Sequence, residues 1–346
     1  MYGQERFARQ GDGGCACVAV PVCTAHAFAA DTLTNVKEPP LFTAWPRRTA
    51  EGFLWLAEND PLGAFVVEDD PREQQDEFVH IDQEAGQYIY LSEDLAVHIR
   101  RFSGVYNRQT VIWYMADIRF DAPNYFRAFS ADPARPSRAQ DKPALIARRN
   151  RVVYAQNGDL FSFRLYNKEK TGLIIRAGKV LREDTYTKPV AKIPPLDELA
   201  LFPDGHMEMR TPGQMTAQAY VDMGAQDVLA FGPILLQGGV KDDRLDMSFT
   251  HREPRSALGV VEPGHFIGIM VEGRNDRSGG APLRFVADRL LEAGCMEAFT
   301  LDGGQTAAML FLGEYVMDPG TYNGFHKVRR QQDIVGIGTS LRVADP

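Results

Sequence analysis

Residues 264–304 read GHFIGIMVEGRNDRSGGAPLRFVADRLLEAGCMEAFTLDGG and carry the clearest structural signal in this 346-residue chain. The run from 265 to 271 is apolar at almost every position, which is typical of a strand buried on both faces. A helical pattern of apolar residues follows, and Gly294 predicts its end. The apolar positions of this helix are Leu283, Val286, Ala287, Leu290 and Leu291. A second apolar run at 297–301 predicts another strand.

Strand, helix and strand in this order predict a βαβ unit whose two strands run parallel. The first strand is followed by Glu272-Gly273-Arg274 and the second by Asp302-Gly303-Gly304. Ligands bind outside the carboxyl ends of the strands in sheets of this kind. We therefore expect Glu272, Arg274 and Asp302 to face one crevice.

Hairpins dominate the rest of the chain. Apolar and aromatic stretches at 96–102 and 111–120 predict strands, and turns at 177–178 and 204–205 each join two short strands. A helix is expected before Gly224. The predicted fold class is α+β, with a mixed, largely antiparallel β-sheet core, flanking helices and the C-terminal βαβ unit.

The first 30 residues differ in composition from the rest. Arg6 and Arg9 precede an apolar run and small residues before Asp31, as in a secretory signal, whereas Glu5 and Asp12 favour a disordered tail. Both interpretations stay open. A signal implies secretion or a place in the cell envelope, and its absence implies the cytoplasm. The expected organisation is a signal peptide or tail at 1–30, an N-terminal extension at 31–84 and a functional domain at 85–346.

Acidic residues outnumber basic ones, which gives a net charge of −8. Nucleic acids and anionic membranes favour a basic surface, so we expect neither as a partner. No run of about 20 apolar residues occurs after the first 30, so no transmembrane segment is expected.

The turn Asp302-Gly303-Gly304 has two interpretations. Glycine amides can approach a bound anion closely, because no side chain stands in the way. Alternatively, Asp302 caps its own turn and has no other role. The expected meeting of two acids and an arginine at one sheet edge favours the first.

From about Leu95 to the end, the chain resembles the phosphodiester glycosidase family, which includes the uncovering enzyme that removes N-acetylglucosamine from the mannose 6-phosphate signal. Six ordered motifs carry the resemblance, and a late arginine, Arg329, matches as well. The motifs are Asn157-Gly158-Asp159, GLIIRAG at 172–178, Phe231-Gly232-Pro233, PRSALG at 254–259, Glu272-Gly273-Arg274 and TLDGGQT at 300–306.

The resemblance implies a hydrolase that cleaves the glycosidic bond of a sugar-1-phosphodiester, acting on envelope or exopolysaccharide glycans. Its expected catalytic acids are Asp302, Glu272 and Asp159, and which of them is nucleophile, acid or base is left open, because that depends on the distance between carboxyl groups. Guanidinium forks suit the phosphate. The expected substrate-binding residues are Asn157, Arg255, Arg274, Gly303, Gly304, Thr306 and Arg329.

Structural roles compete with two of these assignments, since Arg255 can pair with Glu253 and Asn157 can simply support its turn. No cofactor is expected, because no histidines stand at metal-ligand spacing. Calcium bound by the three acids stays open as an alternative.

Several family positions are changed in this chain. Glu272 replaces an aspartate, Thr300 an asparagine and Gln305 a third glycine, while Ala307-Ala308 replaces hydroxyl residues. A misplacement of about 1 Å can cost about 100-fold in rate. The alternative function is therefore a catalytically weakened or inactive carbohydrate-binding protein of the same fold.

Overall fold

The computed structural model describes residues 32–42, 47–49, 52–54, 76–135, 139–159, 172–183, 195–247 and 249–346. Thr32–Pro346 forms one compact unit. The expected signal peptide or tail at 1–30 lies outside the described residues.

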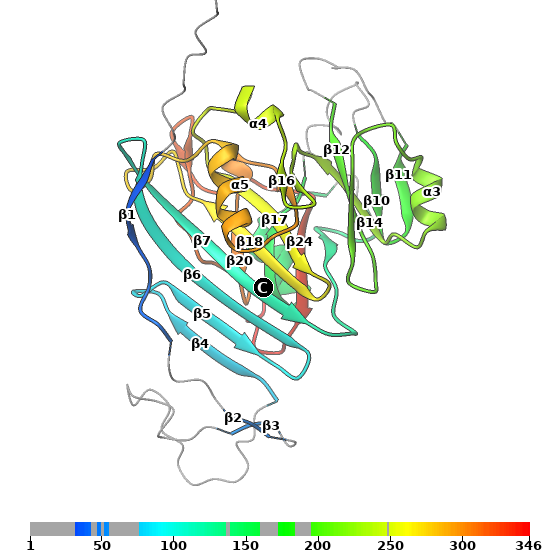
Figure 1. The fold of residues 1–346 in the computed structure, drawn as a ribbon. Helices are drawn as coiled ribbons and strands as arrows, with labels where there is room; N and C mark the ends of the chain where they lie inside the picture. Colours follow the sequence, from blue (N-terminus) through cyan, green and yellow to red (C-terminus); the bar gives the residue numbers. More distant parts are fainter. Residues whose placement is uncertain are drawn as a thin grey trace, which may run out of the picture. The chain divides into compact units, whose positions relative to one another are not determined.

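A ten-stranded sheet is the largest element, and its described pairings are antiparallel (Figure 1). In spatial order its strands are β16 (Val240–Lys241), β15 (Ile234–Gln237), β19 (Glu297–Leu301), β17 (Arg255–Glu262), β18 (His265–Val271), β7 (Gln109–Phe120), β6 (Leu95–Tyr106), β5 (Gln87–Leu91) and β4 (Phe78–Asp82), with β1 (Leu33–Lys37) paired to β6.

Two five-stranded sheets accompany it. One has the order β21 (Glu314–Tyr315), β20 (Met309–Phe311), β9 (Val152–Asn157), β24 (Asp333–Thr339) and β8 (Arg127–Ser130). The other has the order β11 (Lys179–Arg182), β10 (Ile174–Arg176), β14 (Asp227–Phe231), β12 (Asp197–Leu201) and β13 (Met207–Arg210). Two short hairpins complete the strands, β2 (Arg47–Thr49) with β3 (Gly52–Leu54) and β22 (Thr321–Tyr322) with β23 (Phe325–His326).

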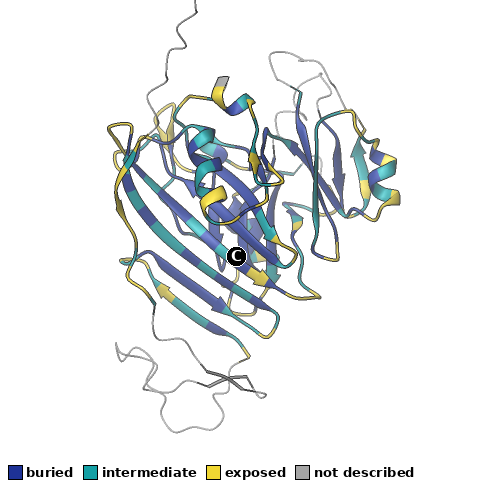
Figure 2. Ribbon diagram, in the orientation of Figure 1, coloured by how far each residue is buried: buried dark blue, intermediate teal, exposed yellow. Residues whose placement is uncertain are grey.

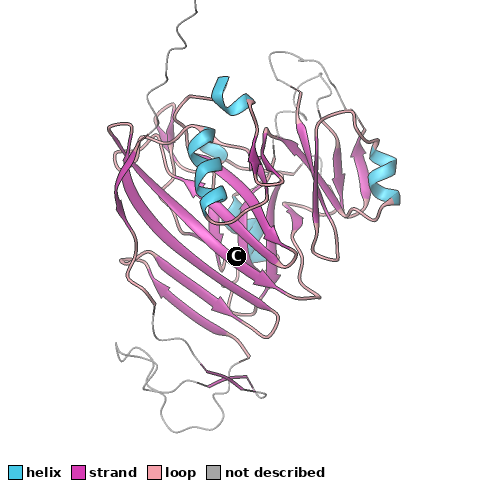
Figure 3. Ribbon diagram, in the orientation of Figure 1, coloured by secondary structure: helices cyan, strands magenta, loops and turns pink. Residues whose placement is uncertain are grey.

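Helices are few among the described residues (Figure 3). They are α1 (Pro143–Arg149), α3 (Ala217–Asp222), α4 (Arg244–Met247), α5 (Leu283–Glu292) and the 3-10 turn η2 (Gly304–Thr306). The fold is thus built mainly from antiparallel β-sheets, as the hairpin-rich sequence indicates. None of the described helices is long and apolar enough to cross a membrane.

Strand β18 is buried along its whole length, which explains its continuous apolar sequence (Figure 2). Phe266 and Met270 on one face share a hydrophobic core with Ile334 of β24. Ile267 and Ile269 on the other face share a core with side chains of α5. Because both faces are covered by packed elements, the strand is apolar after its first residue, His265, whose Nε2 lies 3.1 Å from Asp117 Oδ1.

Helix α5 contains all five positions of the predicted apolar stripe and ends as expected, since Gly294 follows with a φ of 89°. Four of the five predicted core positions are buried. The prediction was wrong for Leu291, which is 38% exposed, while Phe285 is buried in its place. The predicted apolar stripe was centred slightly to one side of the face that the helix buries, which accounts for the difference.

The order of strands β18, β17 and β19 determines how the two strand ends meet. Strand β17 lies between the other two and is antiparallel to both. Strands β18 and β19 therefore run in the same direction without being hydrogen-bonded neighbours, and α5 connects them. Their carboxyl ends lie at one edge of the sheet, where Glu272 and Asp302 follow them.

The boundary expected at 84–85 falls in the turn between β4 and β5. These strands pair with each other, and both belong to the ten-stranded sheet. The sheet therefore includes strands on both sides of that boundary, because hairpin pairing continues across it.

Candidate functional site

Asp302 stands directly after β19 and is 9% exposed. Its backbone is fixed from β9, because Asn157 Nδ2 donates to the Asp302 carbonyl oxygen at 2.8 Å and the Asp302 amide donates to Gly158 O at 3.3 Å. Asn157 is fully buried, and its Oδ1 accepts a hydrogen bond from the Ala308 amide at 3.0 Å. The asparagine thus holds both ends of the turn, which is the structural role left open by the sequence.

Burial raises the pKa of Asp302 to about 6. The Thr306 hydroxyl, the Arg329 guanidinium and the Gly303 amide oppose this shift, while Asp159 adds to it. Asp302 therefore changes its charge close to neutral pH, as is common for groups that transfer protons. Thr306 and Arg329, both predicted site residues, are among the groups that act on this carboxylate.

The amides of Gly303 and Gly304, which the sequence predicts to bind an anion, have partners within the protein in this conformation. The Gly303 amide donates to Asp302 Oδ1 at 2.8 Å, and the Gly304 amide donates to Pro254 O at 2.9 Å. The turn needs glycine at both positions because a side chain would have little room there. A Cβ on Gly303 would stand 2.9 Å from Pro254 O, and one on Gly304 would stand 3.2 Å from Arg274 Nη1.

Two guanidinium groups flank this glycine turn. Arg274 approaches Gly304 as described, and Arg255 Nη1 would lie 3.9 Å from a Cβ on Gly303. Burial lowers the pKa of Arg255 to about 10, and the charge of Arg274 lowers it further, while Glu253 opposes the shift. Two cations that repel each other around one turn create a site that favours an anion.

Guanidinium nitrogens that do not face the glycine turn bind other groups of the protein. Arg255 Nε donates to Ala281 O at 3.1 Å and its Nη2 to His251 O at 2.7 Å. Arg274 Nε lies 2.5 Å from Glu253 Oε2. Glu253 therefore pairs with Arg274, and the pairing with Arg255 considered from sequence is reduced to a longer-range attraction.

Glu272 is fully buried and surrounded by donors. Its Oε1 accepts hydrogen bonds from Arg277 Nη2 at 2.7 Å, the Asp318 amide at 3.0 Å and Tyr114 Oη at 3.2 Å. Its Oε2 lies 3.4 Å from Asn275 Nδ2, so both carboxylate oxygens have partners within the protein. Of the three residues expected to share one crevice, Arg274 lies against the glycine turn that follows Asp302, whereas Glu272 is bound by other partners.

Asp159 lies in a buried ion cluster that the sequence did not reveal. Its Oδ2 accepts from the Ala230 amide at 2.7 Å, and its Oδ1 lies 3.4 Å from Arg176 Nη2. Arg176 also donates through Nε to Asp333 Oδ2 at 2.7 Å. Asp159 is 5% exposed, and its negative charge raises the pKa of Asp302.

Gln331 is a supporting residue with no sequence signal. Its Nε2 donates to Thr306 O at 2.9 Å, and its Oε1 accepts from the Gly158 amide at 3.4 Å. The Arg329 amide binds Gln305 O at 3.0 Å, so the C-terminal segment closes this side of the turn.

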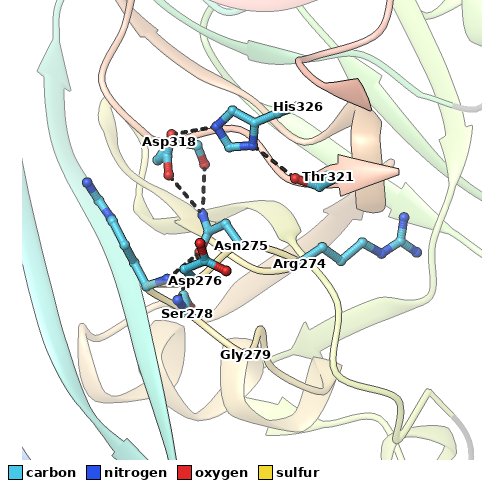
Figure 4. A pocket seen from close by; sticks show the side chains of 9 residues that line it. Arg274, Asn275, Asp276, Ser278, Gly279, Asp318, Thr321 and His326 are labelled. Carbon is cyan, nitrogen blue, oxygen red and sulfur yellow. Dashed lines mark hydrogen bonds and ion pairs between the residues drawn. The ribbon is translucent and has the colours of Figure 1, made fainter. Parts of the chain in front are cut away.

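A polar cavity of about 770 Å³ lies beside Arg274 (Figure 4). His326 connects two of its walls, with Nδ1 3.0 Å from Thr321 Oγ1 and Nε2 3.0 Å from Asp318 Oδ1. Asn275 Nδ2 lies 3.4 Å from Asp318 Oδ2. Within the described part of the chain, no group of three or more His, Cys, Asp or Glu side chains is arranged to hold a metal ion.

Comparison with known proteins places this site in context. The phosphodiester glycosidase family model matches residues 150–337. The SPbeta prophage-derived uncharacterized protein YomE of Bacillus subtilis (strain 168) is 31% identical over 180 residues, which are 49% of this chain and 26% of that protein. The chain thus spans about a quarter of the length of this relative.

Among solved structures, the fold resembles the catalytic domain of zebrafish N-acetylglucosamine-1-phosphodiester alpha-N-acetylglucosaminidase, auto-inhibited by its pro-peptide, with a TM-score of 0.56 and 16% identity over 77% of this chain and 89% of that one. That likeness concerns the fold alone. The family match covers more than half of the chain and includes Asn157, Arg255, Arg274 and Asp302, and it supports a hydrolase of the glycosidase type. The chain belongs to the phosphodiester glycosidase family.

Proposed function

We propose that this protein hydrolyses the glycosidic bond of a sugar-1-phosphodiester in an envelope or exopolysaccharide glycan. One observation carries the proposal. Two guanidinium groups flank the Gly303-Gly304 turn, and the carboxylate that precedes this turn has a pKa raised by burial to about 6. Anion binding and carboxylate chemistry are the two requirements of such a reaction.

Arg255 and Arg274 would bind the phosphodiester. Arg274 would offer the fork of Nη1 and Nη2 to phosphate oxygens, and Arg255 would offer Nη1, since its Nε and Nη2 already donate to Ala281 O and His251 O. Partial burial strengthens the attraction. A phosphate stabilised in this way leaves with little need for protonation. The reaction therefore depends less on a second carboxylate than the hydrolysis of an ordinary glycoside does.

Asp302 would act on the anomeric carbon, either as nucleophile or as base for the attacking water. Both roles need the ionised carboxylate, which prevails above a pH of about 6. Arg329 would favour that charge, because its guanidinium lowers the pKa of Asp302. Asn157 and Gln331 would keep the turn in place while the substrate binds.

A carbohydrate-binding protein without turnover is the second candidate. The observation that favours it is the saturation of Glu272 and Asp159 by internal partners, which leaves one of the three predicted acids beside the arginines. Sugar binding needs the crevice and does not need two carboxyl groups at catalytic separation.

Hydrolysis in water labelled with oxygen-18 tests the proposal and identifies the bond that breaks. The protein is incubated with a panel of sugar-1-phosphodiesters, and both products are analysed by mass spectrometry. Label in the released sugar is expected, because water or the carboxylate attacks the anomeric carbon. Label in the phosphate would mean attack at phosphorus and would contradict the proposal. Binding of a substrate without products would favour the second candidate.

Arg274→Lys is expected to weaken binding of a phosphodiester by about 1–3 kcal/mol, since lysine keeps the charge and loses the fork. Isothermal titration with a slowly hydrolysed sugar-1-phosphodiester measures the loss. Arg284→Lys is the matched control, because Arg284 is 40% exposed and pairs with Asp246 at 2.9 Å on the surface. Equal affinity of the two variants for the phosphodiester would show that Arg274 does not bind the substrate.

A further inference from the structure

The β22–β23 hairpin lies against Arg274. The Thr321 amide donates to Arg274 O at 2.9 Å, and Arg274 Cζ lies 5.3 Å from the ring centroid of Tyr322. A cation at this distance from an aromatic ring is attracted by it. The hairpin thus contacts both the backbone and the guanidinium of the same residue.

Arg274 needs such support because its backbone has a φ of 56°. This left-handed conformation costs a residue with a side chain about 1–2 kcal/mol, and it persists where neighbouring structure enforces it. The segment just before the hairpin packs closely against the residue before Arg274, because a Cβ on Gly320 would stand 2.9 Å from Gly273 O. A close approach of two backbones therefore fixes the segment that carries Arg274.

The Arg274 guanidinium contacts Glu253 and Tyr322, and its two terminal nitrogens face the glycine turn. Glu253 Oε2 lies 2.5 Å from Nε, and the Tyr322 ring lies 5.3 Å from Cζ. Nη1 and Nη2 are the atoms nearest to Gly304, at 3.2 and 3.5 Å from the position of a Cβ there. In the described residues, neither of these nitrogens donates a hydrogen bond to the protein.

We infer that Tyr322 is a positioning residue that holds the Arg274 guanidinium in the orientation needed to bind the substrate phosphate. The inference rests on the proposed function, because it assigns Tyr322 to the same anion site. Without the ring, Arg274 would keep its charge and its contact with Glu253 but would sample more orientations. Binding of an anion would then require ordering of the side chain, which lowers affinity.

The hairpin itself is tied to the site at both ends. His326 connects Thr321 with Asp318, as described above, and Gln305 Nε2 lies 3.4 Å from Phe325 O. Gln305 stands where the family has a third glycine, so the changed position contacts the hairpin. Tyr322 is therefore presented by a structure that is anchored to the turn after Asp302.

Three variants test the inference. Tyr322→Leu removes the ring, Tyr322→Phe keeps it, and Phe325→Leu is the matched control on the same hairpin. Phe325 is 59% exposed, and its ring faces Lys327, with Nζ 4.8 Å from the centroid. Binding of phenyl phosphate is measured by calorimetry, and modification of Arg274 by phenylglyoxal is followed by mass spectrometry.

Tyr322→Leu is expected to bind phenyl phosphate about 3- to 10-fold more weakly and to be modified at Arg274 several times faster, with both control variants like the original protein. Unchanged affinity and unchanged modification in Tyr322→Leu would overturn the inference. If the original protein binds no phosphate at all, the proposed function fails. The modification rate then still decides whether Tyr322 positions Arg274, because this readout needs no substrate.

Discussion

Asp302→Asn is expected to lower turnover of a sugar-1-phosphodiester by about 100-fold or more while the fold stays intact. Asparagine has nearly the same shape, and its Oδ1 can still accept the hydrogen bond from the Gly303 amide. It has no charge with which to attack carbon or to take a proton from water. Release of the sugar, measured at pH 8 where the original carboxylate is ionised, checks the prediction.

The stability of the same variant gives the control. Folding raises the pKa of Asp302 from 3.8 to about 6, so the folded state binds more protons than the unfolded state between these values. The original protein therefore loses stability as pH rises through this window, and asparagine at 302 avoids that loss. The variant should melt at or above the original temperature at pH 8, and the difference should shrink at pH 4. A variant that melts normally and retains full activity would show that Asp302 only stabilises its turn and is not catalytic.

Arg176→Met is expected to lower the free energy of unfolding by about 3–5 kcal/mol, the usual cost of removing one partner from a buried ion pair. Arg176 is 4% exposed and lies between Asp333 and Asp159. Its Nη1 also donates to Val228 O at 2.6 Å. Methionine fills similar space but leaves the carboxylates without a countercharge.

Urea unfolding at pH 7 and pH 5 measures this effect. Burial already raises the pKa of Asp333, and loss of the arginine would raise it further, so protonation at pH 5 should recover part of the stability. Arg135→Met is the control, because Arg135 pairs with Asp132 on the surface and such pairs contribute less than about 1 kcal/mol. Losses of equal size in the two variants would contradict the role given to the cluster.

The sequence predicts elements well where a repeating pattern records which faces are buried. Strand β18 is apolar after its first residue, His265, because it is covered on both faces, and α5 shows its buried stripe at helical spacing. No local sequence pattern predicts that β17 lies between β18 and β19 in the sheet. Spatial order depends on pairings between distant segments, and each segment is compatible with several neighbours.

The same reason explains which site residues could be predicted. Asp302 and Glu272 look alike in the sequence, as acids that follow buried strands. Their surroundings differ, because Tyr114, Arg277 and the Asp318 amide come from other parts of the chain and occupy Glu272. The ion cluster around Arg176 and the contact of Tyr322 with Arg274 are likewise absent from any short motif.

The hydrogen bond from Asn157 to Asp302 joins residues that are 145 positions apart. During synthesis, the asparagine leaves the ribosome long before the turn that it holds. A growing chain therefore cannot possess this site until its last strands have been made and have found their places. An activity assay would therefore detect the site only after these two distant segments have folded together.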